Sequence, residues 1–273
     1  MQIDFETMSL WTEADAVAYF ESGGEFTPPP PGAGPPPPVP LGRAPRIALL
    51  HGTAGNTTIL KMQTSALQRE LAAAGAELHV IEGSRECEKD NPQLQPMVDY
   101  FGDSHKYKEY ARAVWDERRW RTYEAKSMES AITYLEAALA KLPGGGVDVL
   151  VGFSQGANMI TCLAARAERA GRPYRATVLL SLQLPGWAAQ EAELFASPLR
   201  TPSLIIWAPS DTTVYHPDTK ACGPVECSKL FEAGYATQRE HGGPGHRPLP
   251  KDKPEATALV GEIKAFVEAW CPR

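Results

Sequence analysis

Short apolar runs alternate along the chain with stretches in which apolar residues recur at helical spacing. The first run, residues 46–50, ends at His51-Gly52, as expected for a strand buried in a parallel sheet. Further strands are predicted at residues 77–81, 147–151, 176–182, 203–207 and 236–240. Helices are predicted at residues 59–74, 126–142, 157–170, 223–233 and 253–270. Strands that alternate with helices predict an α/β fold with a mostly parallel, doubly wound sheet and functional groups at the carboxyl ends of the strands.

Two regions depart from this alternation. Residues 83–112 form a long polar stretch with few periodic apolar positions, and residues 27–42 are dominated by proline, which lacks an amide proton and fixes φ. The second region is predicted to be a linker between a short amphipathic segment, residues 1–26, and a compact domain, residues 43–273. We expect the function of the domain to be independent of this arm. The apolar face of Trp11, Val17 and Phe20 leaves one alternative, in which the segment docks over the sheet edge as a lid.

Composition and charge narrow the classes of partner. The 273 residues are 43% hydrophobic and 22% charged, which is typical of one well-buried domain with an extension. The net charge of −6 argues against nucleic acid or an anionic membrane, because both bind a concentrated positive face. No run approaches the roughly 18 apolar residues of a membrane span. Five cysteines and an acidic N-terminus favour a soluble, cytoplasmic protein with free thiols, and no spacing of Cys and His predicts a metal or other cofactor.

A serine stands between a predicted strand and a predicted helix in Gly152-Phe153-Ser154-Gln155-Gly156. Glycines on both sides of such a serine allow a turn too sharp for side chains close to its backbone, which exposes the hydroxyl. The pattern predicts a nucleophile elbow at Ser154. The domain is therefore expected to be an α/β-hydrolase.

A serine nucleophile needs a base and a carboxylate that orients the base, and in this fold they follow the serine in the order acid, then histidine. Asp211 follows the strand at residues 203–207 and is the predicted acid, with Asp218, deeper in the same loop, as the alternative. Asp148 lies at the wrong end of the nucleophile strand. A turn-forming role for Asp211 is the competing interpretation.

The base is expected on the loop after the last strand, residues 241–246, which holds two histidines. We favour His246, because the glycines before it allow the loop to bend towards Ser154. His241, close to the strand end, remains the alternative, and His216 is interpreted as an ordinary loop residue.

Two backbone amides are expected to form an oxyanion hole, one from Gln155 directly after the nucleophile and one from Thr53 after the first strand. His51 precedes Gly52 at the strand end and is predicted to brace this loop. Asn56 is predicted to cap the next helix or to pin the loop.

These motifs together resemble those of the FSH family of serine hydrolases, over about residues 45–270. The resemblance rests on residues 46–56 with the His-Gly-x-x-x-Asn loop, the elbow at residues 149–157, Ser210-Asp211 after a strand, and residues 242–246 before the last helix. It implies a Ser154, Asp211 and His246 triad and hydrolysis of an ester or thioester of an acyl chain. Where many relatives have Asp-x-Pro after the second strand, this chain has Glu82-Gly83-Ser84, so the substrate is not carried over.

Aromatic residues on the predicted loops are candidates for a substrate site. Trp187 and Phe195 lie in residues 184–199, and Tyr100, Tyr107 and their aromatic neighbours lie in residues 83–121. Exposed aromatics above a sheet edge suit an acyl pocket, and the equal alternative is that they seal the loops onto the domain.

The leading hypothesis is a serine hydrolase that acts on a small-molecule acyl ester or thioester. A peptidase is a further possibility from motif logic. A rival from another class is a ligand receptor or scaffold on the hydrolase fold, whose Pro-rich arm recruits an SH3- or WW-type partner.

Overall fold

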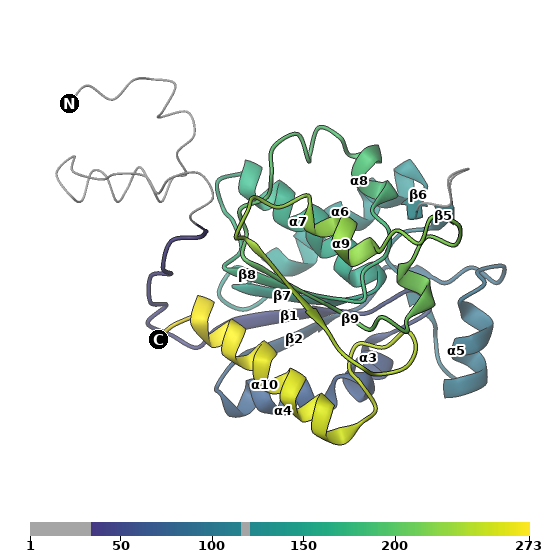
Figure 1. Ribbon diagram of the computed structural model, residues 1–273, viewed down its shortest axis with the longest axis horizontal. Helices are drawn as coiled ribbons and strands as arrows, with labels where there is room; N and C mark the ends of the chain where they lie inside the picture. The colour runs from purple at the N-terminus through teal and green to yellow at the C-terminus, as the bar shows by residue number, and fades with distance from the viewer. Residues whose placement is uncertain (1–33, 116–120) are drawn as a thin grey trace.

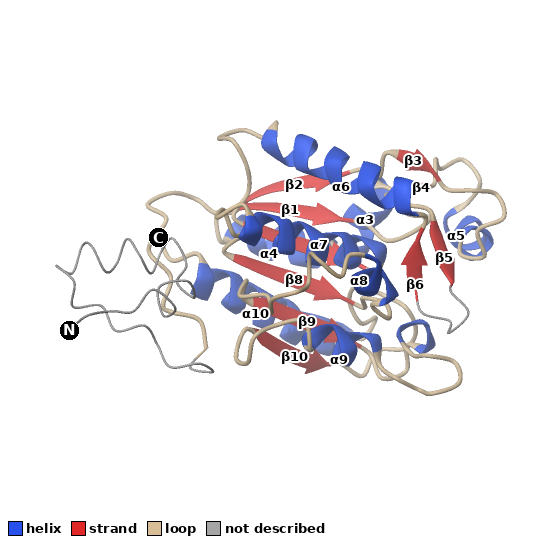
Figure 2. Ribbon diagram, turned by 90° about the horizontal axis from the view of Figure 1, so that it is seen from above, coloured by secondary structure: helices blue, strands red, loops and turns tan. Residues whose placement is uncertain are grey.

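The computed structural model describes residues 34–115 and 121–273, which form a layered α/β domain (Figures 1 and 2). Its centre is a six-stranded sheet in the order β10-β9-β8-β7-β1-β2, in which every neighbouring pair is parallel. The strands are β1 (Arg46–Leu50), β2 (Glu77–Ile81), β7 (Val149–Phe153), β8 (Ala176–Leu180), β9 (Ser203–Trp207) and β10 (Ala236–Glu240). The predicted fold class is confirmed. Four strands have the predicted bounds, whereas β7 is shifted two residues towards Ser154 and β8 ends at residue 180.

Helices cover both faces of the sheet, and the central strands supply apolar side chains to each face in turn. On one face lie α3 (Thr57–Gln63), α4 (Ser65–Ala73) and α10 (Lys253–Trp270), and on the other α6 (Ala125–Ala140), α7 (Gln155–Arg169), α8 (Gly186–Gln190) and α9 (Gly223–Ser228) (Figure 1). In β1, Ile47 and Leu49 pack into the core beneath α4 and α10, and Ala48 and Leu50 pack into the core beneath α6 and α7. This double burial is why the strands appear in the sequence as continuous apolar runs.

The single helix expected at residues 59–74 is two helices, α3 and α4, which meet at Thr64. Thr64 leaves helical geometry with φ −114° and ψ 18°, and its hydroxyl donates to the carbonyl of Leu60 at 2.7 Å. Threonine hydroxyls compete for backbone carbonyls in this way, which weakens and bends a helix. The apolar periodicity continues across the break, so periodicity alone does not reveal it.

The segment between β2 and α6, called the insertion below, includes the polar stretch of residues 83–112, and its described residues lie at the carboxyl ends of the strands (Figure 2). It contains β3 (Arg85–Glu86), α5 (Leu94–Phe101), β4 (Lys108–Glu109), β5 (Ala113–Trp115) and β6 (Arg121–Tyr123). The strands pair as two small antiparallel sheets, β3 with β4 and β5 with β6. Leu94, Met97, Val98 and Phe101 of α5 have helical spacing and pack on Ile59 and its buried neighbours, a short signal that the polar character of the whole stretch conceals.

The end of the predicted linker lies against the domain (Figure 1). The Leu41 amide donates to the carbonyl of Pro272 at 2.8 Å, and the Leu41 side chain packs on the core beneath α10. Just beyond it, Arg43 donates to both carboxylate oxygens of Asp148, at 2.8 and 2.6 Å. Residues 1–33, which include the predicted amphipathic segment and the first part of the proline run, lie outside the described residues. The division into arm and domain stays a prediction.

Within residues 34–115 and 121–273, no helix has both the length and the apolar content needed to cross a membrane.

The contacts of Leu41 predict that residues 34–42, the described part of the arm, contribute to the stability of the domain. A chain that starts at residue 43 should melt about 2–4 °C lower than one that starts at residue 34, because it loses partly buried apolar area and one backbone hydrogen bond worth roughly 1 kcal/mol. Thermal unfolding of both chains checks this. Equal melting temperatures would contradict it.

Candidate active site

Ser154 lies in a strained turn between β7 and α7. Its φ of 54° and ψ of −117° belong to a region that residues other than glycine rarely adopt. The two flanking glycines are required by space: a Cβ at Gly156 would lie 2.5 Å from the carbonyl oxygen of Leu50, and one at Gly152 would lie 2.6 Å from the backbone of Gly156. The helix therefore starts in direct contact with the end of β1, and the serine projects at the carboxyl edge of the sheet.

Asp211 and His246 come together on neighbouring loops at the same edge. Asp211 follows β9 and is fully buried, and its Oδ2 lies 2.7 Å from His246 Nδ1. The other oxygen, Oδ1, accepts the amide of Thr213 at 3.0 Å and the Thr213 hydroxyl at 2.6 Å. Burial alone would raise the pKa of Asp211, but the hydrogen bonds from His246 and Thr213 outweigh it, so this pKa is lower than the ordinary value. The carboxylate is thus ionised and has a partner on each oxygen.

The second nitrogen of His246, Nε2, is buried and has no hydrogen-bond partner. The imidazole packs on Phe153, directly before the nucleophile, with 4.8 Å between ring centroids. Because the carboxylate of Asp211 only accepts, the proton of a neutral His246 belongs on Nδ1 and the lone pair on Nε2. No hydrogen bond of the described residues joins His246 to Ser154. Catalytic contacts of this kind are often long without substrate and shorten in the complex.

The alternative acids and bases have other partners. His241, at the end of β10, accepts the Gly243 amide on Nδ1 at 3.2 Å. His216 accepts the amides of Asp218 and Thr219 on its Nδ1, at 3.1 and 3.0 Å. Asp148 lies at the opposite end of β7 and binds Arg43. Among these candidates, the structure joins the carboxylate of Asp211 to the ring of His246.

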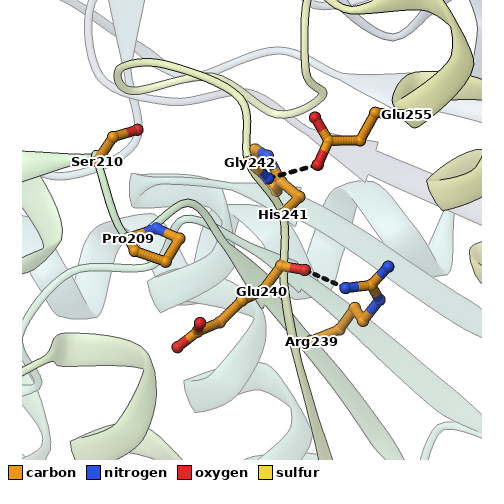
Figure 3. Close-up of a pocket in the computed structure, with 7 residues that line it drawn as sticks. All are labelled: Pro209, Ser210, Arg239, Glu240, His241, Gly242 and Glu255. Atoms are coloured by element: carbon orange, nitrogen blue, oxygen red, sulfur yellow. Dashed lines mark hydrogen bonds between the residues drawn. The ribbon is translucent and has the colours of Figure 1, made fainter.

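A cavity of about 410 Å³ lies beside these two loops rather than at Ser154 (Figure 3). Its lining residues are Pro209, Ser210, Arg239, Glu240, His241, Gly242 and Glu255. Burial lowers the pKa of His241, so this histidine is neutral. The hydroxyl of Ser210 donates to the carbonyl of Gly243 at 2.8 Å, which ties the Asp211 loop to the His246 loop.

The loop after β1 approaches the serine closely. A Cβ at Gly52 would lie 3.0 Å from the Cβ of Ser154, so only glycine fits there without a shift. The next residue, Thr53, is buried, and its hydroxyl has no partner. Among the hydrogen bonds of the described residues, none uses the amide of Thr53 or that of Gln155, the first residue of α7. Two amides without hydrogen-bond partners thus lie next to Ser154 in the chain, at Gln155, and next to Gly52, which approaches Ser154 closely, at Thr53.

His51 and Asn56 hold this loop in place. His51 Nε2 accepts the Gly83 amide at 2.8 Å, and its Nδ1 lies 2.7 Å from the carbonyl oxygen of Gly52. Asn56 caps α3 by accepting the amide of Ile59 at 2.8 Å, and it also donates to the carbonyl of Lys106 at 3.0 Å. Burial lowers the pKa of His51 from 6.5 to about 4, so His51 is a neutral brace with both nitrogens engaged.

The side chain of Gln155 joins the elbow to the insertion. Its Oε1 accepts the amide of Tyr110 at 2.7 Å, and its Nε2 donates to the carbonyl of Ala111 at 2.7 Å. The side chain is fully buried, so these bonds replace the water contacts it has lost. The sequence predicts a role only for the backbone of Gln155, because no local signal identifies the long-range partners of its side chain.

The aromatic candidates differ in exposure: two are buried, one is partly buried and one is exposed. Trp187 is fully buried and makes an edge contact with Phe195 at 5.7 Å between ring centroids. Tyr107 is buried and donates to the carbonyl of Met97 at 3.1 Å. Tyr100 is 67% exposed and lies on α5. The burial of Trp187 and Tyr107 favours loop packing for these two, because each seals part of the structure onto the core.

No three His, Cys, Asp or Glu residues of the described part of the chain gather as metal ligands would. All five cysteines are free thiols.

Comparison with known families gives the geometry a context. The sequence profile described as Serine hydrolase (FSH1) matches residues 42–243, about three quarters of the chain. The chain belongs to the FSH1 serine hydrolase family. The match includes Ser154 and Asp211 but ends three residues before His246. The choice of His246 as the candidate base therefore rests on its hydrogen bond to Asp211 and not on the family match.

Individual relatives of this FSH1 family chain include esterases. It is 29% identical over 128 residues to Esterase FPY3 of Fusarium mangiferae, which is 47% of this chain and 52% of that protein. The chain thus matches about half the length of this curated relative. The structure resembles that of esterase PE8 with a TM-score of 0.54 and 23% identity, over 85% of this chain and 98% of the other. It resembles acyl-protein thioesterase 2 of Zea mays with a TM-score of 0.51 and 20% identity, over 84% and 96%.

The contact between the elbow and β1 predicts opposite effects of two glycine substitutions. Gly156→Ala should destabilise the protein by about 1–3 kcal/mol, because the new methyl group overlaps the backbone of Leu50. The matched control is Gly261→Ala, in an exposed, open position of α10, which should stabilise by about 0.5–1 kcal/mol. Thermal and denaturant unfolding measure both. A Gly156→Ala protein as stable as the wild type would show that the elbow is not tightly packed.

The pKa of His51 predicts part of the pH dependence of stability. The unfolded chain binds this proton near pH 6.5 and the folded protein only near pH 4, so the contribution of His51 is complete above pH 6.5 and falls by about 3 kcal/mol as the pH drops to 4. His51→Gln should lower stability at pH 7.5, and should then lose less stability between pH 6.5 and 4 than the wild type. Denaturant titrations at each pH test this, and parallel curves for the two proteins would contradict it.

Proposed function

We propose that this FSH1 family chain is a serine hydrolase that cleaves carboxylic esters or thioesters through an acyl-enzyme. Ser154 is the nucleophile, His246 the general base and Asp211 the acid that orients it. The observation that carries the proposal is the Asp211–His246 hydrogen bond of 2.7 Å, in which the second ring nitrogen of the histidine is free and the ring packs on Phe153, directly before a serine in elbow geometry.

In the first half of the proposed reaction, Nε2 of His246 removes the proton of the Ser154 hydroxyl as Oγ attacks the acyl carbonyl carbon. The imidazolium that forms lies against the ionised Asp211, so the new positive charge has a partner. The negative charge moves to the carbonyl oxygen, where the amides of Thr53 and Gln155 supply two donors. One donor of this kind typically contributes roughly 3–4 kcal/mol to transition-state stabilisation.

Collapse of the tetrahedral intermediate breaks the bond to the leaving group, and the proton on His246 Nε2 passes to the leaving oxygen or sulfur. Water then takes the place of the alcohol or thiol. His246 removes a proton from this water, hydroxide adds to the acyl carbon, and Ser154 regains its proton as the acid leaves. The same three side chains thus serve both halves of the reaction.

The substrate class is proposed from the relatives. The names of the matched proteins include esterase and acyl-protein thioesterase, which fits an acyl group joined to oxygen or sulfur. Phe195, which is partly buried, and the exposed Tyr100 remain our candidates for contact with the acyl chain. Trp187 and Tyr107 would act behind them as packing.

The competing function is a non-catalytic receptor or scaffold whose proline run binds an SH3- or WW-type partner. It differs from the proposed function in one simple respect, because a protein that only binds its ligand has no need of an activated serine. Such a protein would not be labelled at Ser154 by a fluorophosphonate.

Ser154→Ala should abolish hydrolysis of p-nitrophenyl esters and labelling by a fluorophosphonate, with an unchanged melting temperature. Asp211→Asn and His246→Ala should each lower kcat by a factor on the order of 10⁴, because triad members act as a unit. The matched control is His241→Ala, on the same loop, which should retain most of the activity. A labelled Ser154→Ala protein, or loss of activity in His241→Ala and not in His246→Ala, would overturn the assignment.

A further inference from the structure

Thr213 contacts both members of the Asp211–His246 pair. Its Oγ1 lies 2.6 Å from Asp211 Oδ1 and 2.6 Å from His246 Nδ1. The Thr213 side chain is partly buried at the start of a 3-10 turn, Thr212–Val214, directly after the acid. No pattern in the sequence identifies this position, because the turn itself needs only the backbone amide of Thr213.

The hydrogens of this cluster have one consistent arrangement. The hydroxyl has a single proton, and the carboxylate oxygens of Asp211 can only accept, so the hydroxyl proton points at Oδ1. The proton on His246 Nδ1 then lies between Asp211 Oδ2, at 2.7 Å, and the lone pair of the Thr213 oxygen, at 2.6 Å. Reversing the hydroxyl would leave Oδ1 with the amide alone and would set two donors against each other at Nδ1.

We infer that Thr213 is a positioning residue, whose hydroxyl locks the Asp211 carboxylate and the His246 ring into the arrangement that leaves Nε2 free for Ser154. The inference rests on the proposed function. Without the hydroxyl, Asp211 keeps the amide of Thr213 on Oδ1 and His246 on Oδ2, but no group contacts both the carboxylate and the ring. The hydroxyl contacts both, and so restricts the rotation of one relative to the other. The same hydroxyl holds the oxygen that faces away from the histidine, so the charge of Asp211 stays in place when the imidazolium forms.

The test compares three variants in the full-length protein. Thr213→Val keeps the shape and removes the hydroxyl, and should lower kcat by roughly 10- to 100-fold with KM within about 3-fold, the range expected for one hydrogen bond to a charged group. Thr213→Ser restores the hydroxyl and should recover kcat to within about 3-fold of the wild type. Thr212→Val, at the exposed neighbouring position, controls for the change to the turn.

Two outcomes would overturn the inference. One is a Thr213→Val protein with wild-type kcat. The other is a Thr213→Val protein whose loss of activity follows a lower melting temperature and is not rescued by serine, which would indicate a merely structural role.

A second measurement is independent of turnover. The downfield proton resonance of His246 Nδ1–H, assigned with His246→Ala, should shift or broaden in Thr213→Val and be kept in Thr213→Ser. Failure of the proposed function appears differently, as a wild-type protein that neither hydrolyses esters nor reacts with the fluorophosphonate. In that case an unchanged resonance in Thr213→Val refutes the Thr213 contact on its own.

Discussion

The site depends on the contact between the first turn of α7 and the end of β1. Gly156 has no side chain because the carbonyl oxygens of Leu50 and His51 occupy the space where a Cβ would be, at 2.5 and 2.7 Å. This contact fixes where the helix begins, and the backbone of Ser154 takes up the remaining change of direction in an unfavourable conformation. The surrounding sheet, whose central strands are buried on both faces, stabilises the protein enough to hold this strained turn in place.

Two histidines at the same edge of the sheet show how hydrogen bonding assigns different roles to one side chain. His51 has a partner on each ring nitrogen and a buried ring, which leaves it neutral and fixed. His246 has partners on Nδ1 alone, so its other nitrogen is available to a reactant. The loops account for the difference. The segments that follow β1 and β2 contact both ring nitrogens of His51, whereas the glycines before His246 allow its loop to reach Asp211.

Much of this architecture follows from the sequence, because its signals are local. Apolar runs predicted the bounds of β1 and β9, those of β2 and of the more polar β10 were also predicted, and the glycine pattern predicted the turn at Ser154. The break at Thr64 was not predictable, since it depends on one hydroxyl bonding to a carbonyl within an otherwise helical pattern. The choice of Asp211 followed from chain order, and the choice of His246 over His241 followed from the glycines between them. The roles of the Gln155 and Thr213 side chains did not, because their partners are brought close only by the tertiary fold. The sequence left open whether Trp187 and Tyr107 line a pocket or seal the loops, because composition does not reveal which aromatic residues of a long loop face inward.

Gln155 joins two parts of the molecule that face different demands. Its side chain binds two main-chain groups of the insertion, the amide of Tyr110 and the carbonyl of Ala111, and also interacts with the Tyr123 side chain. Every amino acid except proline offers the same two main-chain groups, so this part of the attachment places little demand on the side chains at positions 110 and 111. Side chains at these positions can therefore change without loss of the two hydrogen bonds that attach the insertion to the first turn of α7. Under the proposed function, this attachment separates the residues that carry out the reaction from the residues of the insertion that contact the substrate.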